Sequence, residues 1–506
     1  MTKNNLATST RRRFIKWGFG TSTGIALTGL WGKGDKTTKK VLAQNESPSK
    51  KRTVLVLGAG MSGLTAALSL LRRGHEVKII EYQNRIGGRL LSLPLKGGQF
   101  TEAGGGHFRA NMPYVLSYIR RFNLPLLTLN DGLPRYLFNG KIFQGSDLSS
   151  FPENLNPQER GVSVSSMLNT YLIMSGLDTD TVLDANWPNQ EVIERFDNMT
   201  LGQLIRQVGG SETFIKLVDA HGGTFTSSSP VVGVIPDLAY HFGDQNLFRI
   251  KGGNDLLPKA MAKEIGLERF ILDAPVVAME QKANQVTVTV KDGRSFRADS
   301  VICTIPFTVL PEITMSPNWS EGKQRMFAEM EWEQTVKVIA QTNTPAWLSK
   351  NIHGWPMAGS DRPWERVIDI TGNEGGGYGN TFFYLNGANK DAMLKLPKAE
   401  RAKAVLEQFR EDMPDLFDEV VTLDDFAWGE QPWIKASFGG PPLGGSWMIR
   451  EWLTPEGLIY FAGDFTTMKS GWVEGAIESG LRAARQIDPL ARSEADSFVR
   501  QEQLCL

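Results

Sequence analysis

This chain of 506 residues contains few cysteines and histidines, and neither positive nor negative charge is in excess. Its two cysteines are Cys303 and Cys505, so a disulfide framework is excluded. The five histidines show no spacing typical of metal ligands, and no H-E-x-x-H zinc motif occurs, so no metal site is predicted. Lysine plus arginine equals aspartate plus glutamate at 55 each, which predicts neither a nucleic-acid groove nor a polybasic membrane surface.

The N-terminal segment predicts export of the chain. Thr10–Lys16 contains Arg11-Arg12 and matches the twin-arginine export pattern, and Val41-Leu42-Ala43 fits a small-residue cleavage site. An uncleaved anchor is the alternative, but Trp17–Trp31 is too short and too rich in glycine to span a membrane. We therefore predict a signal peptide over 1–43 and a polar linker over 44–51. The protein is expected in the periplasm or outside the cell.

Residues 53–89 contain a strand, a glycine-rich turn, a helix and a second strand. The helix-compatible stretch reaches Arg73, and the second strand, 77–80, ends at Glu81. The turn consists of Gly58, Ala59, Gly60, Met61, Ser62 and Gly63. This G-x-G-x-x-G pattern, with an acidic residue eighteen positions after its last glycine, is typical of a Rossmann-like dinucleotide-binding unit.

The physical requirements of dinucleotide binding explain these residue types. Gly58 permits a sharp turn, Gly60 lets a diphosphate approach the backbone, and Gly63 allows close packing of the helix on the strand. Unpaired N–H groups at the helix N-terminus can bind phosphate oxygens, and Glu81 can accept a hydrogen bond from a ribose hydroxyl. An α/β fold that binds a dinucleotide is therefore predicted.

Two further segments distinguish FAD from NAD. The acidic strand is followed by Asn84–Arg89, which ends in Gly-Gly-Arg. Near the other end of the chain, an apolar strand over 457–462 leads to Gly463-Asp464, and a helix is predicted from about Gly471 to Ile487. These segments resemble the FAD-binding segments of flavin-dependent amine oxidases of the monoamine and L-amino-acid oxidase type. The resemblance covers roughly residues 50–490 and is weak between about 125 and 245.

The resemblance implies a two-domain fold. An FAD-binding domain of the glutathione-reductase type is expected to be discontinuous, and a mixed α+β domain is expected to bind substrate. The expected ranges are 52–110, 246–310 and 455–490 for the FAD-binding domain, 111–245 and 311–454 for the substrate domain, and 491–506 for a tail. The residues themselves predict helices over 113–122, 157–175, 190–208, 211–218 and 398–412, and strands near 273–280, 285–290 and 299–306.

The resemblance also implies the residues that contact FAD. They are the six turn residues Gly58–Gly63 together with Glu81, Tyr82, Arg89, Gly105, Gly106, Val276, Gly463, Asp464, Trp472 and Val473. Ser437 stands where monoamine oxidases carry the cysteine that bonds FAD covalently, so noncovalent FAD is expected. With no metal or nucleophile predicted, the chemistry would belong to the flavin.

Lys337 is the expected catalytic residue. It interrupts an apolar strand, Val336–Ala340, and its position resembles that of the family's buried lysine, which holds a water at flavin N5 and assists reaction with oxygen. The alternative is a lysine on a solvated strand face, which is the usual environment of this residue type.

Three aromatic residues are expected to line the substrate site. Phe438 and Trp472 match the two walls of the family's aromatic cage, which steers a neutral amine toward the flavin and excludes water. Trp433 lies in the same segment as Phe438, with packing in the core as its alternative role.

Arg109 is expected to decide the substrate class. L-amino-acid oxidases carry an arginine in this region that grips the substrate carboxylate, and a guanidinium fork suits a carboxylate well. The spacing from Glu102 to Arg109 is about two residues longer than the family pattern, and a surface arginine at a helix start is the alternative. Asp369, on another strand-like segment, is a further candidate that could favour a cationic substrate side chain.

The expected function is therefore oxidation of L-amino acids by FAD and oxygen to 2-oxo acids, ammonia and hydrogen peroxide. The alternatives are a monoamine or polyamine oxidase, and an FAD-binding protein without catalytic activity. The expected partners are a small amine or amino acid, molecular oxygen, and the twin-arginine translocase during export. Nucleic acid is not expected, and a second copy of the chain in a homodimer is a further candidate partner.

Overall fold

The computed structural model describes residues 50–129, 135–144, 151, 154–177, 179, 181–184, 187–221, 225–240, 247–352, 359–362, 364–371, 376–493 and 496. Residues from Ser49 onward form one compact unit. The predicted signal peptide, most of the predicted linker and Cys505 lie outside the described residues. Within the described ranges, no helix combines the length and the apolar character needed to cross a bilayer.

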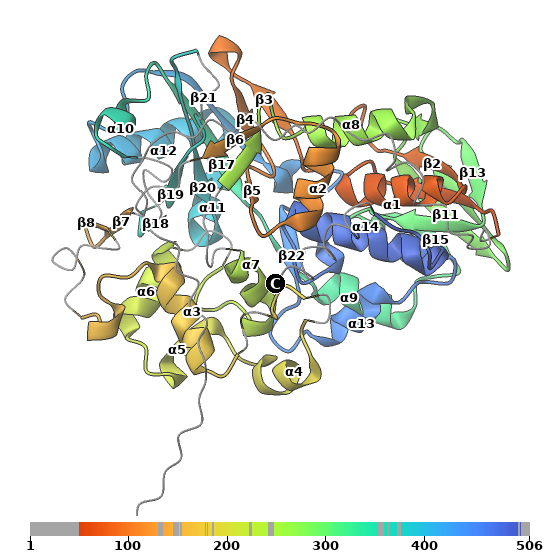
Figure 1. Ribbon diagram of the computed structural model, residues 1–506, viewed down its shortest axis with the longest axis horizontal. Helices are drawn as coiled ribbons and strands as arrows, with labels where there is room; N and C mark the ends of the chain where they lie inside the picture. Colours follow the sequence, from red (N-terminus) through yellow and green to blue (C-terminus); the bar gives the residue numbers. More distant parts are fainter. Residues whose placement is uncertain are drawn as a thin grey trace, which may run out of the picture. The chain divides into compact units, whose positions relative to one another are not determined.

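A five-stranded parallel sheet forms the centre of the predicted FAD-binding region (Figure 1). Its strands, in spatial order, are β10 (Phe270–Ile271), β2 (Glu76–Ile80), β1 (Thr53–Leu57), β14 (Ser300–Cys303) and β23 (Ile459–Phe461). Every neighbouring pair is parallel. The two central strands, β1 and β14, are buried on both faces, which is why they read as apolar runs rather than as alternating patterns.

Different layers cover the two faces of this sheet. One face packs on α1 (Met61–Arg72), α8 (Leu256–Ile265) and α14 (Val473–Ile487) through alternate strand residues such as Val54 and Val56. The other face packs, through Leu55 and Leu57, on a mixed sheet with one parallel and two antiparallel strand pairs. The strands of that sheet are β13 (Ser295–Ala298), β12 (Gln285–Val290), β11 (Val276–Lys282) and β15 (Thr314–Ser316). The predicted α/β fold is confirmed by this arrangement, with sheet strands drawn from distant parts of the chain.

A second, antiparallel sheet lies in the range predicted for the substrate domain. Its order is β19 (Arg366–Asp369), β20 (Gly379–Leu385), β17 (Val336–Thr342) and β21 (Val420–Ala427). One face packs on α12 (Lys398–Asp412), through residues that include Val336, Val338 and Phe383. Alternation along β17 therefore turns Lys337 to the opposite face.

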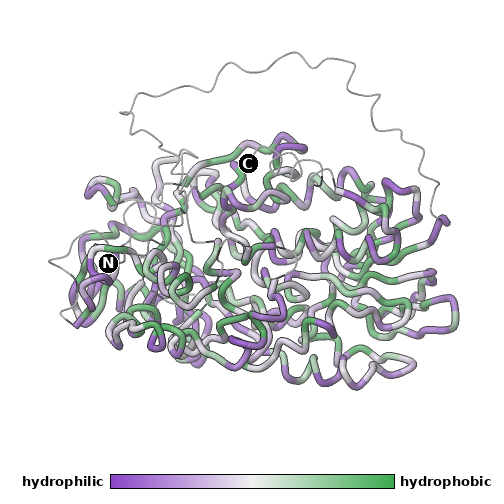
Figure 2. The backbone as a smooth tube through the Cα atoms, turned by 60° about the horizontal axis from the view of Figure 1, so that its bottom comes forward, coloured by the Kyte–Doolittle hydropathy of each residue, from purple (hydrophilic) through white to green (hydrophobic). Residues whose placement is uncertain are grey.

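Five helices build a separate apolar cluster. They are α3 (Val164–Met174), α4 (Gln190–Phe196), α5 (Leu201–Gln207), α6 (Glu212–His221) and α7 (Val231–Ala239). Figure 2 shows that hydrophobic and hydrophilic stretches alternate along the backbone.

Two helices predicted in this region are shorter than expected. The range 190–208 divides into α4 and α5, because the Thr200 side chain accepts a hydrogen bond from the Gln203 N–H and starts a new helix. Likewise, the range 157–175 contains one short 3₁₀ turn and then α3, which begins after the cap Ser163.

The other elements complete the connections between these layers. They are β3 (Ser92–Pro94), β4 (Phe100–Glu102), β5 (Phe108–Arg109), β6 (Leu126–Leu129), β7 (Arg135–Phe138), β8 (Lys141–Gln144), β9 (Leu247–Ile250), β16 (Glu331–Glu333), β18 (Gly359–Ser360), β22 (Phe438–Gly440), α2 (Pro113–Arg121), α9 (Glu321–Glu329), α10 (Ala346–Ser349), α11 (Gly387–Leu394) and α13 (Trp447–Leu453). All five strands of the parallel sheet fall inside the ranges predicted for the FAD-binding domain. The domain boundaries themselves stay a prediction.

A buried carboxyl joins the last helix to an early one. The two carboxyl oxygens of Glu474, in α14, accept hydrogen bonds of 2.9 Å from the Tyr114 and Val115 N–H groups in the first turn of α2. Burial, followed by the nearby charge of Glu478, raises the pKa of Glu474 to about 8. Because this pKa is higher in the folded chain than in the unfolded chain, Glu474 favours folding below pH ~4.5, and that contribution is lost as the pH rises through about 8.

We expect the melting temperature of the wild type to decrease as the pH is raised from 5 to 9. Glu474→Gln should flatten part of this fall, since the amide does not titrate, while lowering the midpoint at pH 5 because one of two N–H groups loses its acceptor. Thermal denaturation followed by circular dichroism over this range checks the expectation. Parallel curves for the two proteins would contradict it.

Candidate active site

A cavity of about 1000 Å³ opens where the parallel sheet meets the antiparallel sheet β19-β20-β17-β21 and helix α7. The residues that follow three parallel strands line it: Gly58 after β1, Glu81 after β2 and Thr304 after β14. Ligands of open α/β sheets bind at these carboxyl ends. The predicted site residues that line this cavity are Gly58, Gly60, Met61, Ser62, Glu81, Tyr82, Arg89, Gly105, Gly106, Val276, Lys337, Trp433, Phe438, Gly463, Asp464, Trp472 and Val473.

The glycine turn has the geometry that a diphosphate needs. Gly58 has a φ of +108°, and a Cβ there would lie 2.2 Å from Thr304 Oγ1. A Cβ at Gly60 would meet only Gly88 Cα, at 3.8 Å, so the space beside it is open. Gly60 is also the N-cap of α1, and no side chain caps that helix. The first N–H groups of α1 are thus available to an anion.

Two turn residues lie outside the cavity lining. Gly63 packs against the strand side, where an added Cβ would lie 2.2 Å from Gly58 O, as its predicted packing role requires. Ala59 donates its N–H to Glu81 Oε2 at 2.7 Å. Glu81 also accepts from the Gln83 N–H at 2.9 Å, and burial raises the pKa of its carboxyl. These bonds hold a carboxylate at the cavity edge, in the place expected for ribose recognition.

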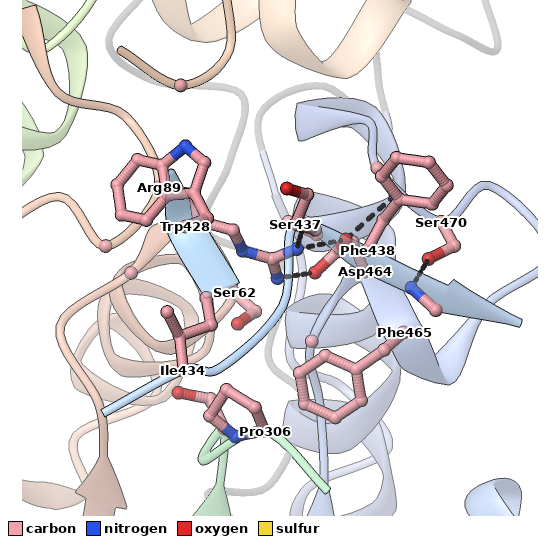
Figure 3. A pocket seen from close by; sticks show the side chains of 18 of the residues that line it. Ser62, Arg89, Pro306, Trp428, Ile434, Ser437, Phe438, Asp464, Phe465 and Ser470 are labelled. Carbon is pink, nitrogen blue, oxygen red and sulfur yellow. Dashed lines mark hydrogen bonds and ion pairs between the residues drawn. The ribbon is translucent and has the colours of Figure 1, made fainter. Parts of the chain in front are cut away.

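Arg89 and Asp464 are brought together from opposite ends of the chain (Figure 3). The Arg89 guanidinium pairs with both carboxylate oxygens of Asp464, one of them at 2.9 Å, and also donates to the Ser437 carbonyl. Asp464 further accepts from the Gly471 N–H at 2.8 Å. A guanidinium, a carboxylate and a backbone carbonyl from three segments of the chain therefore meet at one point of the cavity.

Three polar side chains form a row across the antiparallel sheet. Lys337 on β17 is opposite Tyr384 on β20, which is opposite Arg366 on β19, and all three line the cavity. Lys337 is 4% exposed, so the alternative of a solvated strand face does not hold. Its ammonium group donates to the Glu102 and Gly104 carbonyls at 2.9 and 2.5 Å. The function of this buried cation stays a prediction.

The predicted aromatic walls come from two segments. Trp472, the N-cap of α14, donates its indole N–H to Asp237 Oδ1 at 2.6 Å and has the edge of His107 at a ring distance of 5.8 Å. Phe438 begins β22, and Trp433 packs edge-on against Trp428 at 5.6 Å. All three predicted aromatic residues line the cavity.

Arg109 is buried, with 1% exposure, and does not line the cavity. The positive charge of Arg109 nevertheless influences the His107 imidazole. Burial lowers the pKa of the His107 imidazole well below 6.5, and the charges of Arg109, Lys337 and Arg366 lower it further. Both effects favour the neutral imidazole, and the three cations that contribute come from three different strands.

Comparison with known proteins gives the family. Residues 61–488 match the model for flavin containing amine oxidoreductases. The chain belongs to this family. An L-amino-acid oxidase of Mus musculus is 28% identical, over 87% of this chain and 71% of its own length. The flavin-containing amine oxidase B of Homo sapiens is 25% identical, over 87% and 86%. The fold resembles a putrescine oxidase structure, with a TM-score of 0.74 and 22% identity over 86% of this chain and 99% of the other.

The cavity of this amine oxidoreductase fits the FAD that the family requires. The diphosphate would lie at Gly58, Gly60 and the N-terminus of α1, where no side chain intrudes. Glu81 would hold a ribose, and Arg89 with Asp464 would meet the polar middle of the cofactor. Among the residues that the structure describes, no group of His, Cys, Asp and Glu is arranged to hold a metal ion.

Sequence reasoning missed two charged residues of this amine oxidoreductase. Arg366 and Asp237 both line the cavity. Asp369, which we considered from the sequence, does not line it and accepts a hydrogen bond from the Thr371 N–H instead. Arg366 begins β19 beside the apolar pair Val367-Ile368, and the local sequence does not indicate which face of the sheet its side chain occupies. Asp237 is the one charged residue of the otherwise apolar segment Val231–Ala239, and this signal could have identified it.

Proposed function

We propose that this amine oxidoreductase is an FAD-dependent oxidase of L-amino acids, which converts them to 2-oxo acids, ammonia and hydrogen peroxide. The bound FAD would supply the two-electron oxidation of the carbon–nitrogen bond and pass the electrons to oxygen. The chain's own residues would bind the substrate, orient it and exclude water.

The observation that carries this proposal is the positive charge at one end of the cavity. Arg109, Lys337 and Arg366 act together on His107, and Arg366 lines the open space. Positive charge in a site that is shielded from water attracts a carboxylate strongly. An amino acid carries an α-carboxylate that can respond to this charge, whereas a simple amine has none. A guanidinium also offers two parallel N–H donors, which match a carboxylate.

The substrate would then lie between the charged row and the aromatic walls. With its carboxylate at Arg366, the amino group and Cα are held beside Trp472 and Phe438, so that orientation rather than strong binding lowers the barrier. The neutral His107 adds no positive charge of its own near the carboxylate site. Its Nε2 is buried and has no hydrogen-bond partner among the described residues.

A monoamine or polyamine oxidase is the second candidate. Asp237 favours it, because a carboxylate that lines the cavity beside Trp472 could attract an ammonium group. In that case Arg109 and Arg366 would have structural roles. Arg366 does donate to the His221 carbonyl, at 2.7 Å from its Nε, which is compatible with such a role.

Three accompanying proposals concern cofactor attachment, location and assembly. We propose noncovalent FAD, because Ser437 lines the cavity where related monoamine oxidases carry a cysteine, and Cys303 is buried in β14. Export by the twin-arginine pathway to the periplasm, and a homodimer, stay predictions from the sequence.

Peroxide release from the purified, FAD-loaded protein tests the function. The panel should contain the twenty L-amino acids and, for several of them, the matching amine without the carboxylate, such as L-phenylalanine with 2-phenylethylamine. We expect release with amino acids only. Turnover of amines alone would establish the second candidate, and no release with any compound would favour an FAD-binding protein without oxidase activity.

A further inference from the structure

Two glycines that line the cavity have no local reason to be glycine. Gly233 lies inside α7, and Gly440 ends β22. Neither has a positive φ. A Cβ at Gly233 would approach no heavy atom nearer than Pro441 O, at 3.8 Å, and a Cβ at Gly440 would have nothing within 4 Å. Gly58 differs in both respects, since its turn and its packing each require glycine.

Glycine is an unfavourable choice inside a helix. It gives up more conformational freedom on folding than alanine and contributes no side chain to packing. Since neither backbone strain nor a close contact accounts for Gly233, what the glycine provides is open space in the cavity. The same reasoning applies to Gly440, in a strand that would otherwise favour a larger residue.

The two glycines border the same part of the cavity. In α7 all residues are buried except Gly233 and Asp237, which are one helical turn apart and share a face. The opposite side of α7 packs in the helical cluster. The contact of Gly233 with Pro441 places this face next to Gly440. At its other end, Asp237 binds the indole of Trp472 at 2.6 Å, so the face continues into the aromatic wall.

The space beside these glycines has mainly apolar walls. Pro230, Val234, Pro441 and Met468 line the cavity along with the ring of Trp472. The one carboxylate on this face, Asp237, uses an oxygen to hold Trp472. The cations Lys337 and Arg366 belong instead to the antiparallel sheet. An apolar group would therefore be accommodated here at little electrostatic cost.

We propose that Gly233 and Gly440 shape the subsite for the substrate's side chain, and that the preferred substrates carry bulky apolar side chains, aromatic ones included. The proposal rests on the proposed amino-acid oxidase function and specifies its substrate class. The glycines determine specificity by leaving room that an alanine or leucine side chain would fill.

Volume added at these positions tests the subsite. Gly233→Leu and Gly440→Leu are each expected to lower kcat/KM at least tenfold for L-phenylalanine and L-tryptophan, mainly through KM, and less than twofold for L-alanine. Gly233→Ala should give an intermediate effect. Glu194→Leu, at an exposed position of α4 outside the cavity, adds a leucine to the same helical region and should change neither value. Bound FAD and the thermal midpoint verify that each variant is folded.

The outcomes separate this proposal from the proposed function. Equal losses for large and small substrates, or no loss, would overturn the subsite. If the wild type oxidises amines alone, the amino-acid proposal fails, and the same variants are then compared on 2-phenylethylamine and ethylamine. Selective loss of the larger amine would still support a side-chain subsite at Gly233 and Gly440, and an equal loss would overturn it. The two glycines lie on different elements. If both leucine variants show the same selective loss, a distortion confined to α7 cannot be its cause.

Discussion

Arg366→Met is expected to lower kcat/KM for L-amino acids by roughly 10²- to 4 × 10³-fold, because a substrate carboxylate would then lie in a buried site without its cation. Losing one partner of a buried charge pair costs about 3–5 kcal/mol, and each 1.4 kcal/mol corresponds to about tenfold. Stopped-flow reduction of the flavin by L-phenylalanine and by 2-phenylethylamine measures the effect. The amine should lose much less, since it has no carboxylate to bind.

Variants of other arginines control for this result. Arg401→Met removes a guanidinium that is 6% exposed in α12 and pairs with Glu430 at 2.7 Å, outside the cavity. It should lower stability but leave the preference for amino acids over amines unchanged. Arg109→Ala should resemble Arg366→Met with a smaller loss, because Arg109 acts near His107 without lining the cavity. Equal losses for the amino acid and the amine in Arg366→Met would refute a carboxylate-binding role.

Lys337→Met is expected to slow oxidase turnover at least tenfold. The ammonium group is the buried cation of the cavity on β17, held by two carbonyls and lying 4.4 Å from the centre of the Phe382 ring. A cation held in a dry site can stabilise the negative charge that develops when oxygen is reduced. Met is similar in length and apolar, so the substitution removes the charge while keeping most of the packing.

Oxygen dependence distinguishes a functional from a structural role for Lys337. The loss should fall mainly on the rate of flavin reoxidation, measured by mixing reduced enzyme with oxygen, and much less on substrate binding. Lys337→Arg is the matched variant that keeps the charge. A reoxidation rate that falls less than tenfold in Lys337→Met would show that this lysine is dispensable for oxidase chemistry.

The parts of the site that could be predicted from the sequence depend on short-range patterns. The turn Gly58–Gly63 and the acid at Glu81 belong to one continuous segment, so their spacing alone fixes their relation. Arg89 and Asp464 are far apart in the chain, and only the resemblance to known oxidases indicated that both meet the cofactor. The structure joins them directly.

The residues that were missed depend on long-range packing. Arg366 and Asp369 flank the apolar pair Val367-Ile368, and alternation turns them to opposite faces of β19. Only the register with Tyr384 and Lys337 shows that Arg366 faces the cavity. The open space at Gly233 depends on Pro441, more than two hundred positions later in the chain. No local sequence pattern predicts that residues so far apart in the chain lie next to each other.

The place of β23 and α14 in the fold sets an order of events during synthesis. These elements and the segment between them supply the edge of the parallel sheet, the packing partner of α1, the Asp464 carboxylate and the carboxyl group that caps α2. They also follow the nucleotide-binding turn by about four hundred positions in the chain. The nucleotide-binding turn can form early, but the cofactor cannot be enclosed until residues beyond 459 have emerged. We therefore expect the cofactor to be enclosed only after β23 and α14 have been synthesised, and a chain without α14 would leave the buried face of α1 uncovered.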